Sequence, residues 1–238
     1  VKHELNDYSL LGDEDTDFIG SAQASDFDGD GDMDFVFTVD GHVTGPVKVY
    51  LWENPGYDKC TEKDWPYHVI ASIEGVHAND MRIADMDNDG KPDIVIRHKE
   101  PDDVKILFQN TINSWTVKSG PAGYQGEGLA IGDLNGDGVP DIAFTGFWFK
   151  APQKPRIGKY RQYIIDKEFY SINPASKEDI GDINGNGRND IVISPAESFP
   201  KYGGENYVLA WYECPDNPES DGWKRHVIET NYNDGHFI

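Results

Sequence analysis

Four short loops in the chain combine acidic and amide side chains with glycine in one fixed pattern. Each loop is nine residues long, with Asp or Asn at positions 1, 3 and 5, glycine at position 6 and Asp at position 9. Carboxylate and amide oxygens suit a hard cation such as calcium, and glycine allows the sharp bend that folds a chain around one ion. Four matches in register therefore predict calcium sites. The loops are Asp26–Asp34, Asp85–Asp93, Asp133–Asp141 and Asp182–Asp190.

We predict that positions 1, 3, 5, 7 and 9 of each loop surround the ion, which gives up to four calcium ions per chain. At positions 1, 3, 5 and 9 the successive loops hold four, four, three and two carboxylates, so we expect the fourth loop to bind calcium most weakly. The predicted ligands are Asp26, Asp28, Asp30, Asp32 and Asp34; Asp85, Asp87, Asp89, Lys91 and Asp93; Asp133, Asn135, Asp137, Val139 and Asp141; and Asp182, Asn184, Asn186, Arg188 and Asp190.

The residues around the loops indicate strands. An EF-hand closes with Glu at position 12 and lies between helices, but here position 12 is Phe37, Ile96, Phe144 or Ile193, inside a short apolar run. Short apolar runs bounded by turn residues are typical of buried strands. Another short stretch precedes each loop, as at 81–84 and 128–131. We therefore expect a strand, a calcium loop and a second strand, with the ion stapling the hairpin.

The loops recur at a period that is typical of β-propellers. Their first Asp residues are spaced by 59, 48 and 49 residues, and one propeller blade is one four-stranded sheet. We expect the two outer strands at 47–53 and 67–71, at 104–109 and 115–118, and at 207–213 and 224–229. The third unit is less regular because Pro152 and Pro155 interrupt its outer half. The expected class is all-β, in one domain over 1–238, with units at 12–71, 72–119, 120–168 and 169–230.

On these loops and the strands that follow them, the chain resembles the FG-GAP or VCBS repeat β-propellers. This family includes the integrin α-chain head and many secreted bacterial and fungal proteins. The Phe-Gly and Gly-Ala-Pro signatures of integrin repeats are missing, which favours the enzyme-associated and lectin-associated relatives. The phrases Trp52-Glu53-Asn54-Pro55 and His68-Val69-Ile70 resemble propellers linked to sugar-processing enzymes, including aldos-2-ulose dehydratase-like and polysaccharide lyase-like chains. The resemblance implies a calcium-binding propeller that binds or processes carbohydrate.

The two ends of the sequence suggest an arc cut from a larger ring. Residues 2–5 resemble a closing fourth strand, and residues 231–238 resemble the start of a further unit. About seven blades of ~50 residues each would need a chain of roughly 350 to 400 residues. The alternative is a compact four-blade ring with ragged ends.

The composition of the chain argues against some classes of binding partner. A net charge of −22 argues against nucleic acid, which needs a basic footprint. No stretch approaches the ~20 apolar residues needed to cross a bilayer. Loops of this kind suit the millimolar calcium found outside cells, so we expect a secreted or surface-exposed protein. Cys60 and Cys214 follow equivalent Trp-Glu phrases in different units, so we expect unpaired or intermolecularly paired thiols and not a bridge between the two.

Two functional hypotheses follow. Eliminative cleavage of a uronic-acid polysaccharide needs a cation near the carboxylate and a base of near-neutral pKa. Arg97 is the candidate cation, and His77, His98 and His236 are the candidate bases. Sugar binding needs an exposed aromatic platform, such as Trp148, Trp52 or Trp211. Trp148 is the first choice because the other tryptophans recur once per unit and are expected to pack between blades. A protein-interaction or adhesion module is the remaining alternative.

Overall fold

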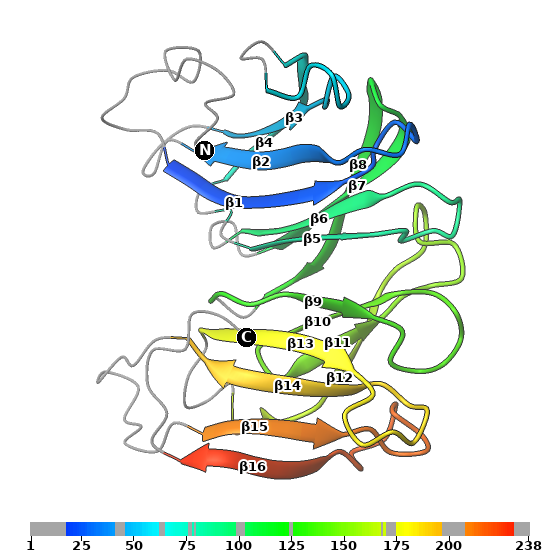
Figure 1. The fold of residues 1–238 in the computed structure, drawn as a ribbon. Coiled ribbons are helices and arrows are strands. Elements are labelled where there is room, and N and C mark those ends of the chain that lie inside the picture. Colours follow the sequence, from blue (N-terminus) through cyan, green and yellow to red (C-terminus); the bar gives the residue numbers. More distant parts are fainter. Residues whose placement is uncertain are drawn as a thin grey trace. The chain divides into compact units, whose positions relative to one another are not determined.

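The structure is a computed structural model of an all-β chain (Figure 1). It describes residues 18–40, 46–61, 65–75, 78, 80–98, 103–123, 126–167, 169, 175–196 and 208–230. These residues contain sixteen strands and almost no helix. The predicted all-β class is therefore confirmed.

The strands form four antiparallel sheets of four strands each, and in every sheet the spatial order follows the chain. This is the arrangement of propeller blades, so the predicted β-propeller-like fold is also confirmed. The first sheet contains β1 (Phe18–Ser25), β2 (Asp34–Asp40), β3 (Val47–Trp52) and β4 (Tyr67–Ile73); the second β5 (Asp80–Ala84), β6 (Asp93–His98), β7 (Asp103–Thr111) and β8 (Ser114–Ala122); the third β9 (Ala130–Gly132), β10 (Asp141–Phe144), β11 (Phe147–Lys150) and β12 (Arg161–Ile164); the fourth β13 (Ser176–Gly181), β14 (Asp190–Pro195), β15 (Val208–Glu213) and β16 (Lys224–Thr230).

Each nine-residue loop joins the first two strands of its sheet, as predicted. The register is the same in all four hairpins, because the residue just before the loop pairs with the Asp at position 9. The pairs are Ser25 with Asp34, Ala84 with Asp93, Gly132 with Asp141 and Gly181 with Asp190. Since side chains alternate between the faces of a strand, one register gives all four sheets the same inward and outward positions.

The chain groups into two compact units. The first carries the first two sheets and the second carries the last two, while residues 86–88 and 102–104 group with the second unit. In the first unit one apolar core joins the two sheets. We call the face of a sheet that meets the following sheet its forward face, and the face that meets the preceding sheet its backward face. The core lies between the forward face of the first sheet (Phe27, Val36, Val49 and Leu51) and the backward face of the second (Met81, Ile94, Ile96 and Leu107).

The second unit repeats this packing. The forward face of the third sheet (Leu134, Ala143 and Trp148) packs against the backward face of the fourth (Ile191, Ile193, Ala210 and Tyr212). The equivalence follows from the register, since Val36 and Ala143 each lie two residues after the position-9 Asp. Consecutive sheets in each unit are therefore joined by a buried interface between a forward and a backward face.

This packing overturns one expectation about the tryptophans. Trp148 was expected to be exposed, but its side chain is 0% exposed and stacks on Tyr163 at 4.9 Å between ring centroids. Trp148 stands where Leu51 stands in the first sheet, so it points into the interface between two sheets. Because prolines interrupt the outer half of the third unit, the strand pattern in the sequence did not show this equivalence. Trp148 therefore cannot act as an exposed platform for a sugar.

Candidate metal centre

The Asp at position 1 organises the tip of every loop. Its side chain accepts a hydrogen bond from the backbone N–H of the position-6 glycine, at 2.8 to 3.0 Å, in Asp26, Asp85, Asp133 and Asp182. Positions 3 and 5 make shorter Asx-type turns. In the first loop Asp28 accepts from the N–H of Asp30, and Asp30 accepts from the N–H of Asp32, both at 3.0 Å. These bonds fold the loop onto its own side-chain oxygens.

Two positions in each loop require a left-handed backbone. Position 6 is glycine throughout, with φ between 84° and 98°. Position 4 is also left-handed, with φ of 80° at Gly29 and 58° at Asn88. The sequence reasoning noticed only position 6, although Gly, Asn, Gly and Gly at position 4 carry the same signal. Because no atom lies within 4 Å of a Cβ built at Gly29 or Gly31, backbone conformation rather than space selects glycine here.

The Asp at position 9 is buried, and it anchors the loop through backbone hydrogen bonds. Asp34 accepts the N–H of Phe27 at 2.8 Å with one oxygen and that of Asn54 at 2.9 Å with the other. The first bond holds the loop and the second holds the residue two places beyond the end of the third strand. The other three sheets repeat the second bond, with Gln109, Ala151 and Cys214 donating to Asp93, Asp141 and Asp190. Sequence reasoning missed this link because the donor lies 10 to 24 residues away.

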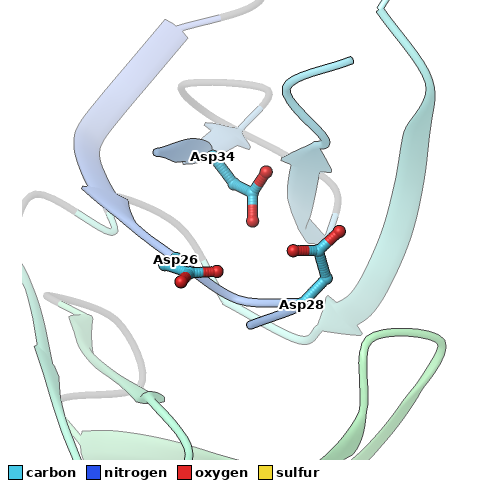
Figure 2. Close-up of side chains that lie close together, drawn as sticks. All are labelled: Asp26, Asp28 and Asp34. Atoms are coloured by element: carbon cyan, nitrogen blue, oxygen red, sulfur yellow. The ribbon is translucent and has the colours of Figure 1, made fainter. Parts of the chain in front are cut away.

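Two loops bring three carboxylates together. Asp26, Asp28 and Asp34 form one group (Figure 2), and Asp85, Asp87 and Asp89 form the other; in each, the three candidate oxygens lie within 4.8 Å of one another. Calcium takes oxygen ligands at about 2.3 to 2.6 Å, so three such oxygens can share one ion. Three of the five predicted ligands therefore lie close together in each of the first two loops. The third and fourth loops carry Asn at one or two of these positions and hold less charge.

Buried oxygens support the fit to a cation. Within the described part of the chain, Oδ1 of Asp32 and Oδ1 of Asp87 are buried and accept no hydrogen bond. A buried carboxylate oxygen without a partner is costly, and a bound cation would satisfy it. Both atoms belong to the predicted ligand sets of the first two loops. The donor set is all oxygen, which suits calcium rather than a softer metal.

Burial disfavours the ionised form of two position-9 carboxylates, those of Asp34 and Asp141. Burial, with a smaller contribution from the charges of Asp137 and Asp133, raises the pKa of Asp141 to about 7 in spite of two backbone hydrogen bonds that lower it. Burial also raises the pKa of Asp34, with nearby Asp28 and Asp32 adding to the shift. Both shifts come mainly from burial and in smaller part from neighbouring carboxylates, and a bound divalent ion would favour the ionised form of these groups.

At position 7, three of the four side chains offer no oxygen. The Lys91 ammonium group bonds a carboxylate oxygen of Asp89 at 2.9 Å, and Arg188 donates to the backbone carbonyl of Cys214 at 3.0 Å. Val139 has an apolar side chain. A ligand at this position could therefore only be the backbone carbonyl. Asp32 is the exception, because its side chain carries a carboxylate.

The predicted catalytic residues fall into two groups. His77 and His236 lie outside the described residues. Arg97 and His98 follow one another on β6, and their side chains are 2% and 0% exposed. Side chains this deeply buried offer little surface to a polymer, so their catalytic role stays a prediction.

Cys60 and Cys214 form no disulfide with each other. Cys214 is buried, and this burial raises the pKa of its thiol to about 11. Its Sγ lies 3.5 Å from the backbone carbonyl of Leu134 in the preceding sheet. Within the described residues, no helix is long and apolar enough to cross a membrane.

Comparison with known proteins supports one family. The model described as FG-GAP-like repeat matches residues 26–96 and 85–144, which together span half of the chain. The matches begin at the first residue of a nine-residue loop and end in the strand after the next loop. The comparison with curated proteins found no match.

Proposed function

Because the chain belongs to the FG-GAP-like repeat family, we propose that it is an extracellular calcium-binding repeat module that binds carbohydrate. The convergence of three carboxylates in each of the first two loops carries the calcium part of this proposal. The ion would be held by positions 1, 3, 5 and 9, with the carbonyl of position 7 completing the set. It would neutralise the acids and fix the hairpin from which the rest of each sheet extends.

Calcium removal tests the first part. Because clustered carboxylates repel one another once the ion leaves, excess EGTA should lower the melting temperature strongly, and calcium should restore it. Elemental analysis of the purified protein should find calcium. An unchanged melt in EGTA, with no metal found, would defeat the proposal.

The loops should differ in affinity. Asp85→Ala removes a carboxylate from a loop with four at positions 1, 3, 5 and 9, whereas Asp182→Ala removes one of two. Affinity follows ligand charge, so calorimetric titration should show that Asp85→Ala removes a tight site and Asp182→Ala a weak one. Loss of the tightest site in Asp182→Ala would contradict this ranking.

The carbohydrate part rests on the resemblance to propellers linked to sugar-processing enzymes. With Trp148 buried, Trp52 and Trp211 are the remaining candidate platforms, and both are half-buried. Titration with a panel of acidic and neutral oligosaccharides should show saturable binding, monitored by tryptophan fluorescence. Appearance of the ultraviolet absorbance of an unsaturated uronate would support the lyase alternative, in which His77, Arg97, His98 or His236 acts. Neither signal across the panel would leave a protein-interaction module.

A further inference from the structure

A side-chain amide joins the third nine-residue loop to the fourth. Asn189 is at position 8 of the fourth loop, and its Nδ2 donates to the backbone carbonyl of Asp133 at 2.8 Å. Asp133 is the position-1 residue of the third loop, so this hydrogen bond connects two loops that are both candidate calcium sites. Both residues belong to the second compact unit, so the contact lies within one unit.

On the fourth loop, the amide is carried by a part of the backbone that the folded loop holds in place. Just before Asn189, the N–H of Arg188 donates to Oδ1 of Asn186 at 2.8 Å. Just after it, the carboxylate of Asp190 accepts the N–H of Ile183 at 3.1 Å. A cation bound through Asn186 and Asp190 would hold the same folded conformation. The place of the Asn189 amide therefore depends on the order of the fourth loop.

On the third loop, the amide reaches a residue whose side chain is a candidate ligand. The carboxylate of Asp133 accepts the N–H groups of Gly136 and Gly138, both at 2.8 Å. Its backbone carbonyl accepts the Asn189 amide, so the main chain and the side chain of this residue are both held. Without the amide, calcium binding would have to restrict the Asp133 backbone at a cost in conformational entropy. Asn189 thus pre-organises the third loop.

A second contact runs beside the first. Sγ of Cys214 donates to the backbone carbonyl of Leu134, which follows Asp133, at 3.5 Å. The N–H of Cys214 binds Asp190 at 2.9 Å, and the N–H of Leu134 binds Asp141 at 3.1 Å. Leu134 and Cys214 are 3% and 1% exposed, so this contact is buried. The position-9 carboxylates of the two loops are therefore linked through one buried pair of residues.

The first unit shows the second kind of contact but has a different residue at the place of Asn189. Nε2 of Gln109 donates to the backbone carbonyl of Phe27 at 2.6 Å, as Cys214 does to the equivalent carbonyl in the second unit. Position 8 of the second loop, however, is Pro92, whose side chain has no hydrogen-bond donor. The amide contact from position 8 therefore distinguishes the third and fourth loops from the first and second.

The charges of the two loops allow both to be filled. At positions 1, 3, 5 and 9 the third loop has three carboxylates and the fourth has two, five in all, against four positive charges from two calcium ions. The carboxylates therefore offset the repulsion between two ions in neighbouring loops. The fourth loop has the fewest charged ligands of the four, so its filling depends most on a favourable contact with a neighbour.

We propose that the third and fourth loops bind calcium cooperatively, and that the Asn189 amide couples them by joining the folded fourth loop to Asp133. This inference rests on the proposed calcium binding and adds that one filled loop raises the affinity of the other. Such coupling is reciprocal, so each ion raises the affinity for the other by the same factor. The net contribution of one hydrogen bond sets that factor at roughly two- to tenfold.

Nuclear magnetic resonance of the full chain labelled with ¹⁵N-glycine gives each loop its own signal. The N–H of Gly138 donates to Asp133 and that of Gly187 donates to Asp182, both at 2.8 Å, so each signal should shift when its loop binds calcium. Asp133→Ala removes a ligand from the third loop only. It should nevertheless raise the calcium midpoint of the Gly187 signal roughly two- to tenfold, because the fourth loop loses its filled neighbour.

Asn189→Ala tests which group carries the coupling. This variant should raise the Gly187 midpoint by the same factor, and adding Asp133→Ala to it should cause no further rise. Asp137→Ala, at the exposed position 5, is a second way to weaken the third loop and should act like Asp133→Ala. Asn54→Ala is the matched control, because it removes an amide that donates to the Met33 carbonyl within the first sheet. It should leave the Gly187 midpoint unchanged.

The outcomes separate this proposal from calcium binding itself. If both glycine signals respond to calcium but the Gly187 midpoint is the same in wild type, Asp133→Ala and Asn189→Ala, the loops are independent and the coupling is overturned, while calcium binding stands. Additive rises in the double variant would overturn the role of Asn189. Signals that do not respond to calcium in the wild type would overturn both proposals. Unchanged melting temperatures in EGTA would show that the variants are folded.

Discussion

At the scale of single residues, the position-9 Asp has two roles. Its carboxylate is a candidate calcium ligand, and it also ties the loop to the end of the third strand through backbone hydrogen bonds. Asp190 shows both bonds, from Ile183 at 3.1 Å and from Cys214 at 2.9 Å, and its side chain is buried. This explains why Asp occupies position 9 in every loop while Asn replaces it at positions 3 and 5 of the fourth. An amide has a single acceptor oxygen, whereas the two N–H groups here bind different carboxylate oxygens.

The structural role can be separated from metal binding by removing the metal. With EGTA present, Asp190→Ala should lower the free energy of unfolding by about 2 kcal/mol or more, because one buried and one part-buried N–H group lose their acceptor. Asp182→Ala is the matched control in the same loop. Its side chain is exposed, so water can replace the lost bonds and the cost should stay below about 1 kcal/mol. Urea denaturation measures both, and equal stability of the two variants would argue against the anchor.

At the scale of elements, the hairpin is the unit that the sequence describes best. The predicted strands at 47–53, 67–71 and 224–229 correspond to β3, β4 and β16 within two residues. Local signals suffice here, because a loop of known conformation sets the register of its two strands. The third sheet was harder to predict, since β11 and β12 have only four residues each and the segment between them contains two prolines. Its strands became recognisable only through their pairing.

Each sheet also needs a neighbour. A four-stranded sheet with apolar residues on both faces can bury them only between two other layers. Within each unit one pair of faces is buried in this way. Outside these two interfaces, Phe35 on the first sheet and Ile183 on the fourth sheet are partly exposed.

At the scale of the whole molecule, negative charge dominates. The net charge is −22, and many of the acids lie in the four loops. Repulsion of this size disfavours the compact state unless cations offset it. Calcium binding would therefore act on the whole charge distribution as well as on each hairpin.

The pH dependence of stability should reverse when calcium is removed. In the metal-free fold the pKa of Asp141 is about 7, above the 3.8 of an unperturbed Asp. A pKa raised on folding contributes stability that is complete below about 3.8 and is lost as the pH rises to about 7. At about 1.4 kcal/mol per pKa unit, the loss is on the order of a few kcal/mol. In EGTA the melting temperature should therefore fall between pH 4.5 and pH 7.5.

With calcium bound, the ion favours the ionised carboxylates, so stability should hold or rise over the same range. Differential scanning fluorimetry across the pH series, with and without EGTA, measures both curves. Parallel curves in the two conditions would contradict the prediction.

The sequence alone determined the features that depend on near neighbours along the chain. The ligand types, the left-handed glycine at position 6 and the strand on either side of each loop all arise within about ten residues. Tertiary structure decided which faces are buried. Alternation along a strand separates two faces, but it does not say which of them meets another sheet, so Trp148 was expected on the surface and lies in an interface. The second anchor of the position-9 Asp likewise depends on a third strand that pairs back after an intervening loop, and only the folded sheet brings that strand's N–H to the carboxylate.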